Sequence, residues 1–206
     1  MKLHWSSRSP YVRKVMAAAI ETGTVESIEP VLSIVMLQTV NDTVLADNPL
    51  GKIPTLVTDD GETWYDSLVI CEYLNLHRTR ASIMPADPVQ RLAALRWHAL
   101  GNGLTDLLVL WNNERNRPAT LRSEAHLHAH EAKAGAVLRH LDSTVAQLAG
   151  EPLHVGHLAI GAALDYANFR FPTLAWTPRH PSLSAWFQTL AARDSFQRTQ
   201  HYDPAA

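Results

Sequence analysis

Cysteine is nearly absent from this chain of 206 residues, because Cys71 is the only one. A single cysteine excludes a framework of disulfides within the chain and is typical of a reducing compartment. Long apolar runs are lacking too, since none approaches the roughly 18 residues that a helix needs to cross a bilayer. The first residues carry charge and a proline where a signal peptide requires an unbroken apolar segment. We therefore expect a cytoplasmic protein without a membrane span.

An excess of basic charge is also lacking. The chain has 18 Lys and Arg against 20 Asp and Glu, for a formal net charge of -2, and no basic run stands out. Nucleic-acid surfaces and electrostatic membrane anchors need concentrated positive charge, so we expect neither partner. Apolar residues are plentiful, at 46% against 18% charged, which is enough for a substantial buried core.

The first eighty residues alternate short β-like and helix-like stretches. A strand, a crossover helix and a parallel strand, followed by a hairpin and a helix, predict a small open sheet with helices on its faces. Apolar residues at helical spacing predict the helices, and β-branched residues with turn signals predict the strands. The predicted strands cover residues 2–5, 27–36, 55–58 and 63–65, and the helices cover residues 10–22 and 66–77.

From about Pro88 onward the pattern is helical almost throughout. Residues 78–87 form a polar linker that contains proline. We therefore predict an α/β domain over residues 1–77 and an all-α domain over residues 88–206. The expected helices of the second domain cover residues 89–112, 121–148, 156–168 and 181–192.

Ser9 and Pro10 open the first predicted helix. As a structural pair, the serine hydroxyl caps free N–H groups and proline fits the first turn. The same geometry also has a chemical use, because a hydroxyl at the positive end of a helix can donate to a thiolate. A hydrogen bond to the charged form contributes roughly 1.5–3 kcal/mol, which lowers a thiol pKa by about one to two units. Both interpretations stay open from the residues alone.

Pro54 enters a predicted strand from a tight loop, after Lys52 and Ile53. One interpretation is an ordinary trans proline at a sheet edge. The other is a cis bond, which costs an X–Pro peptide only about 0.5–1 kcal/mol and turns the chain sharply. In that case the backbone N–H and C=O of Ile53 are exposed and can hold an extended peptide-like ligand as an added strand.

Asp66 and Ser67 open the next predicted helix and suffice as plain capping residues. In a functional interpretation, the Ser67 hydroxyl and N–H bind a carboxylate at the helix end while Asp66 accepts from an ammonium group. This arrangement recognises an α-amino-acid head group. Together with Ser9 and Ile53, these residues describe a groove for a small peptide that carries a thiol.

With these features, the sequence resembles the glutathione S-transferase family, and within it small bacterial members. The resemblance spans nearly the whole chain. It implies a thioredoxin-like domain with a cis-proline at Pro54, an all-α domain, and a homodimer with one glutathione site per subunit. The matching stretches are residues 9–15, 48–54, 65–67, 70–74, 117–118 and 180–196.

The resemblance also implies a role for each matching residue. Ser9 is the catalytic hydroxyl that stabilises the glutathione thiolate, and Ile53 pairs with the cysteinyl backbone. Lys52 reaches a carboxylate, while Asp66 and Ser67 hold the γ-glutamyl end. The implied activity is attack of glutathione on small electrophilic, mainly apolar substrates, as in detoxification. The alternative is a glutathione-binding or interaction protein on the same scaffold with little transferase activity.

Other residues receive expectations of their own. The family's layout makes Trp111 and Arg115 candidates for a second-substrate pocket, although core packing accounts equally for a tryptophan in an amphipathic helix. Arg13 and Lys14 are expected on a solvated helix face. Cys71, inside a predicted helix, is expected to be a buried packing residue.

Two features depart from common patterns. His157 and Ile160 stand where the family often has Ser or Thr followed by Asp, so we expect the capping box of that helix to be missing, at about 1 kcal/mol. His126 and His130 share a helix face, but no third ligand is evident, and a solvated face is favoured over a zinc site. No metal is therefore expected.

Overall fold

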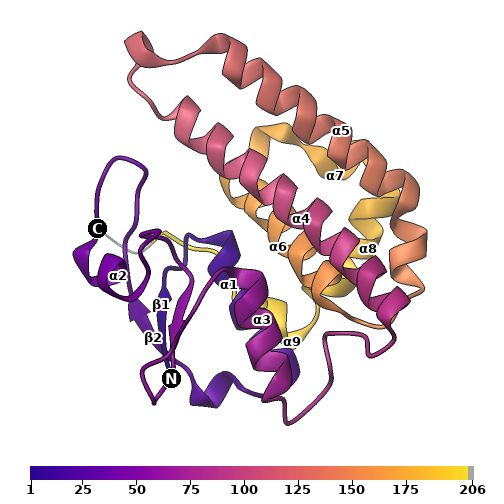
Figure 1. Cartoon of the computed structure of the whole chain (residues 1–206). Coiled ribbons are helices and arrows are strands. Elements are labelled where there is room, and N and C mark those ends of the chain that lie inside the picture. Colours follow the sequence, from indigo (N-terminus) through magenta and orange to yellow (C-terminus); the bar gives the residue numbers. More distant parts are fainter. Residues whose placement is uncertain (204–206) are drawn as a thin grey trace. The chain divides into compact units, whose positions relative to one another are not determined.

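A sheet of four strands organises the first part of the structure, a computed structural model that describes residues 1–203. The strands are ordered β2-β1-β3-β4, and Figure 1 labels the parallel pair β1 and β2. β1 pairs in parallel with β2 and antiparallel with β3, which is itself antiparallel to β4. Their bounds are β1 (Lys2–Trp5), β2 (Glu29–Leu32), β3 (Thr55–Val57) and β4 (Thr63–Trp64).

These strand directions bring four segments of the chain to one end of the sheet. Because β1 and β2 are parallel, their carboxyl ends lie together. β3 runs the other way, with Thr55 opposite His4, so its amino end lies there as well. Trp64 pairs with Leu56 at the close of β4, which therefore also ends there. We call this the loop end of the sheet.

Three helices accompany the sheet: α1 (Pro10–Thr22), α2 (Asp42–Asp47) and α3 (Ser67–Leu76). The bounds predicted for the first helix are confirmed, and α1 stops at Gly23, whose φ of 78° suits glycine. The short helix α2 was not predicted. It is tied to β1 because Lys2 and His4 both donate to Asp47 at 2.7 Å, and these hydrogen bonds lower the pKa of that carboxyl.

Residues 194–203 belong to the same compact unit as residues 1–92. Helix α9 (Asp194–Gln197) lies beside α1 in Figure 1. The Arg13 guanidinium donates to the carbonyls of Thr199 at 2.8 Å and Phe196 at 3.2 Å, and it lies over the Phe196 ring. This segment therefore covers a side of α1 that was expected, from the sequence, to be exposed to solvent.

The expected solvated face for Arg13 and Lys14 is accordingly wrong, since both side chains are buried. The C-terminal segment encloses Arg13. Lys14 lies near Cys71 of α3, where its positive charge opposes the effect of burial on the thiol. Cys71 itself is fully buried, as expected, and burial raises its pKa to about 12.

The second unit, residues 93–193, is helical as predicted. Two glycines allow close helix packing: a Cβ on Gly101 would lie 2.5 Å from the Ile160 nitrogen, and one on Gly156 would lie 2.5 Å from Trp97 Cβ. The expected domain bounds, 1–77 and 88–206 with a linker over 78–87, remain a prediction. The helices are α4 (Pro88–Arg115), which begins in the first unit, α5 (Glu124–Ala149), α6 (Val155–Arg170), α7 (Trp176–Arg179) and α8 (Pro181–Ala191).

Helix α6 begins with a capping box, so the expectation that this box is missing is wrong. Two histidines build it. Nδ1 of His154 accepts from the Gly156 N–H at 3.0 Å, and Nδ1 of His157 accepts from the His154 N–H at 3.2 Å. Imidazole nitrogens here take the place of the usual hydroxyl and carboxylate acceptors.

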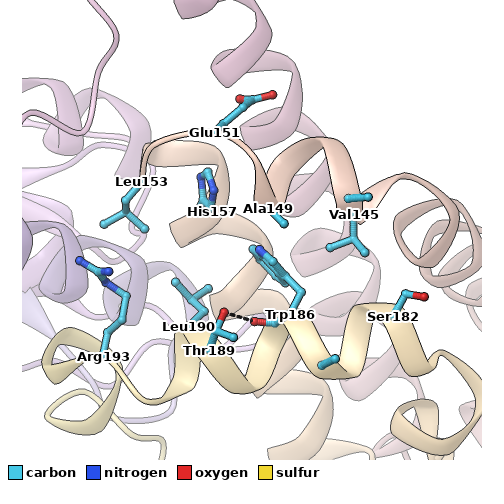
Figure 2. A pocket seen from close by; sticks show the side chains of 12 residues that line it. Val145, Ala149, Glu151, Leu153, His157, Ser182, Trp186, Thr189, Leu190 and Arg193 are labelled. Carbon is cyan, nitrogen blue, oxygen red and sulfur yellow. Dashed lines mark hydrogen bonds between the residues drawn. The ribbon is translucent and has the colours of Figure 1, made fainter.

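Because each Nδ1 accepts, each neutral imidazole donates through Nε2. His154 donates to the Glu151 carboxylate at 2.7 Å and His157 to the Leu148 carbonyl at 3.0 Å. His157 lines a groove of about 640 Å³ together with residues of α5 and α8 such as Trp186 (Figure 2). Burial lowers the pKa of His157 to about 4, which keeps the ring neutral as the capping contact requires.

We expect acid to destabilise the protein through His157. Its pKa of about 4 in the folded state lies below the value of about 6.5 for an unfolded histidine. Between these values the unfolded chain takes up a proton that the folded chain excludes. The free energy of unfolding should therefore fall as the pH falls through this range, by up to about 3 kcal/mol. Chemical denaturation from about pH 7 to about pH 4 measures this dependence.

The matched variant is His157→Asn, whose Oδ1 can accept from the same N–H without titrating. Groups that do not contact His157 contribute equally to the pH dependence of both proteins. The difference between the two profiles therefore reports His157 together with its contact with His154. We expect a flatter profile for the variant. Parallel profiles would contradict the assignment.

Candidate functional site

Ser9 opens α1 directly after the loop that follows β1. Its Oγ accepts a hydrogen bond from the Val12 N–H at 3.3 Å, which makes it the helix N-cap. A hydroxyl has two acceptor positions and one donor. Within residues 1–203 the Ser9 hydroxyl proton has no acceptor. Capping and donation to a ligand are therefore compatible at this residue, which is only half-buried.

Ile53 lies between the loop after α2 and the start of β3. The Ile53–Pro54 peptide bond is cis. In the part of the chain that the structure describes, neither the N–H nor the C=O of Ile53 has a hydrogen-bond partner. Its side chain forms an apolar cluster with Val12 of α1 and Val44 of α2. This cluster joins the beginning of α1 to the segment before β3.

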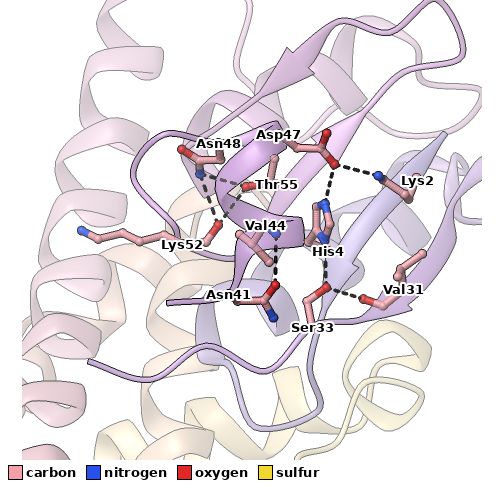
Figure 3. A network of polar contacts seen from close by, with 10 residues as sticks. All are labelled: Lys2, His4, Val31, Ser33, Asn41, Val44, Asp47, Asn48, Lys52 and Thr55. Carbon is pink, nitrogen blue, oxygen red and sulfur yellow. Dashed lines mark hydrogen bonds and ion pairs between the residues drawn. The ribbon is translucent and has the colours of Figure 1, made fainter. Parts of the chain in front are cut away.

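The backbone and the side chain of Lys52 have different roles. Its backbone carbonyl accepts hydrogen bonds from Asn48 and Thr55. Its exposed side chain extends away from these contacts, as Figure 3 shows. The ammonium group is thus available at the surface of the loop that carries Ile53.

Asp66 and Ser67 begin α3 immediately after β4. The Asp66 carboxylate caps the helix by accepting from the Leu68 N–H at 3.0 Å and is exposed. The Tyr65–Asp66 peptide bond is also cis. Ser67 is buried, yet neither its hydroxyl nor its N–H has a partner within residues 1–203. Two donors and one carboxylate therefore converge at this helix terminus.

The sheet topology brings these groups together at its loop end. Ser9 follows the carboxyl end of β1, Ile53 precedes the amino end of β3, and Ser67 follows the carboxyl end of β4. The three local features that the sequence suggested separately thus lie together at the loop end of the sheet. Their individual roles in binding stay predictions.

The sequence analysis did not predict that residues 201–203 contact the loop before Ser9. Ser7 Oγ donates to the Tyr202 carbonyl at 2.8 Å, and His201 Nδ1 lies 2.8 Å from the Ser7 carbonyl. Arg8 pairs with Asp203 at 2.9 Å. These contacts fasten the loop that ends at Ser9. No local sequence pattern predicts these contacts, because the partners are almost two hundred residues apart in the sequence.

Trp111 and Arg115 line a separate cavity of about 240 Å³ inside the second unit. The Trp111 and Phe171 ring centroids are 4.5 Å apart, and the Arg115 guanidinium lies 4.1 Å from the Phe171 centroid. Arg115 also donates to the Arg170 carbonyl at 2.5 Å, and burial lowers its pKa. The structure thus brings the two residues together around Phe171. A second-substrate role for this cavity stays a prediction.

Among residues 1–203, no three His, Cys, Asp or Glu side chains are grouped so as to hold a metal ion. None of the helices in that range is long and apolar enough to span a membrane.

Known proteins match the chain along nearly its full length. The model of the glutathione S-transferase N-terminal domain matches residues 8–77, and that of the C-terminal domain matches residues 124–189. The uncharacterized GST-like protein YibF of Escherichia coli K12 is 34% identical over 203 residues, which cover 97% of this chain and 98% of that protein.

Solved structures are also similar to the chain along nearly its full length. A glutathione transferase family member from Pseudomonas fluorescens Pf-5, with bound glutathione, has a TM-score of 0.94 and 32% identity over 98% of this chain and 99% of that one. A glutathione S-transferase from Methylobacillus flagellatus, also with glutathione bound, has a TM-score of 0.87 and 33% identity over 98% and 99% of the two chains.

The architecture is a thioredoxin-like sheet with helices, followed by a helical part, which confirms the predicted fold class. The chain belongs to the glutathione S-transferase family, as the resemblance in its sequence implied.

Two arginines that contact the C-terminal segment should differ in their effect on stability. Arg13→Met leaves the Phe196 and Thr199 carbonyls without their charged donor, and we expect the free energy of unfolding to fall by about 2–3 kcal/mol. Arg8→Met breaks only the exposed pair with Asp203 and should cost less than about 1 kcal/mol. Chemical denaturation measures both, and hydrogen exchange over residues 196–203 should rise in the Arg13 variant. Equal effects of the two substitutions would contradict this assignment.

Proposed function

We propose that this protein is a glutathione transferase that binds glutathione at the loop end of the sheet and activates its thiol. The substrates are small, electrophilic and mainly apolar molecules. The observation that carries the proposal is the Ser9 hydroxyl, whose proton has no acceptor within residues 1–203 and which stands at the positive end of α1. The relatives from Pseudomonas fluorescens and Methylobacillus flagellatus, both solved with bound glutathione, support the ligand.

Ser9 acts as a donor and does not itself ionise. An unperturbed thiol has a pKa of about 8.5, so little thiolate exists at neutral pH. A hydrogen bond of roughly 1.5–3 kcal/mol to the charged form lowers that pKa by about one to two units. The thiol proton leaves to solvent, and a sulfur lone pair forms the new bond to the electrophilic carbon. The electron pair displaced from that carbon goes to its leaving group or to the adjacent atom of an activated double bond.

The remaining contacts hold the tripeptide in place. Ile53 offers an unpaired N–H and C=O, which suit the backbone of the cysteinyl residue. Lys52 offers an exposed ammonium group to a carboxylate. Ser67 provides two donors for the γ-glutamyl carboxylate, and the exposed Asp66 provides an acceptor for its ammonium. Besides the lowered thiol pKa, this positioning of the thiolate contributes to the rate enhancement.

A second candidate function is glutathione binding with little transferase activity. One observation favours it: the capping contact of Ser9 with the Val12 N–H accounts for this serine without any catalysis. A protein of this kind would bind glutathione and yet conjugate nothing across a broad panel of electrophiles.

We further propose that the protein is a cytoplasmic homodimer. Its single cysteine, buried and unable to form a disulfide within the chain, suits a reducing compartment. Exposed apolar side chains on α3 and at the start of α4, including Leu76, Val89 and Leu92, suit a contact between subunits. Light scattering at micromolar concentration should give the mass of a dimer. A monomer at these concentrations would refute this part of the proposal.

The test of the transferase proposal is Ser9→Ala. We expect kcat/KM for conjugation to fall at least about tenfold, because the thiolate loses its donor. The dissociation constant of glutathione should change little, since the backbone contacts remain. The pKa of the bound thiol, followed by the ultraviolet absorbance of the thiolate, should rise by about one to two units.

Ser9→Thr is the matched control, because it keeps both the hydroxyl and the helix cap. It should retain most of the conjugating activity. Unchanged conjugation and an unchanged thiol pKa in Ser9→Ala would exclude Ser9 as the donor. A thermal-shift titration of the wild type with glutathione tests binding itself, since a ligand of the folded state raises Tm.

A further inference from the structure

A closed group of hydrogen bonds joins Asn48, Lys52 and Thr55, which flank Ile53 in the chain (Figure 3). The side-chain amide of Asn48 donates to the Lys52 carbonyl at 3.2 Å and to the Thr55 hydroxyl at 2.9 Å. The Thr55 hydroxyl donates in turn to the same Lys52 carbonyl at 2.8 Å. We call this group the carbonyl clamp.

The carbonyl clamp uses every strong donor that it contains. Both protons of the Asn48 amide and the proton of the Thr55 hydroxyl are donated, and the Asn48 Oδ1 accepts from the Leu50 N–H at 3.0 Å. Asn48 is 1% exposed and Thr55 0%. Because all their donors are used and almost none of their surface is exposed, neither side chain is available to bind a ligand directly. A buried polar network that is fully satisfied fixes the geometry of the groups it bonds.

The bonded carbonyl shares a peptide group with the N–H of Ile53. This Lys52–Ile53 bond is trans, since the cis bonds of the described chain lie elsewhere. In a planar trans peptide the C=O and the N–H point in opposite directions. Two hydrogen bonds that draw the Lys52 carbonyl inward therefore turn the Ile53 N–H outward. That N–H is one of the groups without a partner within residues 1–203.

We infer that Asn48 and Thr55 are positioning residues for ligand binding, because the carbonyl clamp aims the Ile53 N–H at the cysteinyl carbonyl of glutathione. The inference rests on the proposed function, in which Ile53 pairs with the tripeptide backbone. It assigns recognition of the peptide backbone to two buried side chains, neither of which contacts the ligand.

The first test is Thr55→Val, which keeps the size of the side chain and removes the hydroxyl. We expect the dissociation constant of glutathione to rise about tenfold, as one well-placed hydrogen bond is lost. The value of kcat at saturating glutathione should stay within about twofold, because Ser9 still meets the bound thiol. Thr55→Ser restores the hydroxyl and should restore the affinity. Asn48→Ala leaves the shorter of the two hydrogen bonds, from Thr55, on the Lys52 carbonyl, so we expect a smaller effect. This variant serves if Thr55→Val folds poorly.

Thr22→Val is the control for a general loss of stability. Thr22 is also 0% exposed, and its hydroxyl bonds the Ala18 carbonyl within α1, far along the helix from Ser9. This variant should lower Tm without changing the affinity for glutathione. Equal losses of affinity in Thr22→Val and Thr55→Val would overturn the inference.

A second test changes the ligand. A glutathione analogue with an ester in place of the Cys–Gly amide keeps the cysteinyl carbonyl but makes it a weaker acceptor. If the carbonyl clamp acts through the Ile53 N–H, the wild type loses more affinity for the analogue than Thr55→Val does. Equal losses in both proteins would overturn the inference while glutathione binding stands. Failure of the wild type to bind glutathione at all would overturn the proposed function and the inference together.

Discussion

The antiparallel pairing of β1 with β3 places Ser9 and Ile53 at the same end of the sheet. Thr55 opposite His4 brings the carboxyl end of β1 beside the amino end of β3, so the residues just beyond these ends become neighbours. A shift of this register by one residue would turn each side chain of β3 to the other face of the sheet. Thr55 would then leave the carbonyl clamp, and the peptide group that precedes Ile53 would lose its anchor.

The groups gathered at the loop end are mainly donors. The Ser9 hydroxyl, the Ile53 N–H and the two donors of Ser67 have no partners within residues 1–203, and Lys52 adds an exposed cation. In the proposed function these donors meet a ligand with a thiolate, two carboxylates and several carbonyl oxygens. The exposed Asp66 and the Ile53 carbonyl are the complementary acceptors, because the same ligand carries one ammonium group and peptide N–H groups. The balance of donors and acceptors therefore supports glutathione independently of the overall fold.

Local chemistry explains which parts of the structure could be predicted from the sequence. Helix α1 could be bounded because Ser9, Pro10 and Gly23 act through adjacent backbone. The burial of Arg13 could not, because the residues that cover it are more than 180 positions away in the sequence. The capping box of α6 was missed for another reason. A histidine caps a helix only when one tautomer is held, and here Glu151 and Leu148 hold it.

The candidate site, too, has features that local sequence indicates and features that depend on contacts in the folded chain. Ser9, Asp66 and Ser67 could be suggested from sequence because their side chains carry the chemistry. Ile53 could be suggested only through the proline that follows it, because it offers only its backbone, and any apolar residue that fills the cluster with Val12 could offer the same groups. What distinguishes the position is the direction of one N–H, which the buried Asn48 and Thr55 determine through the opposite side of the peptide. In the proposed function, recognition of the peptide backbone therefore depends on Asn48 and Thr55, two buried residues that local sequence patterns do not mark as part of the site.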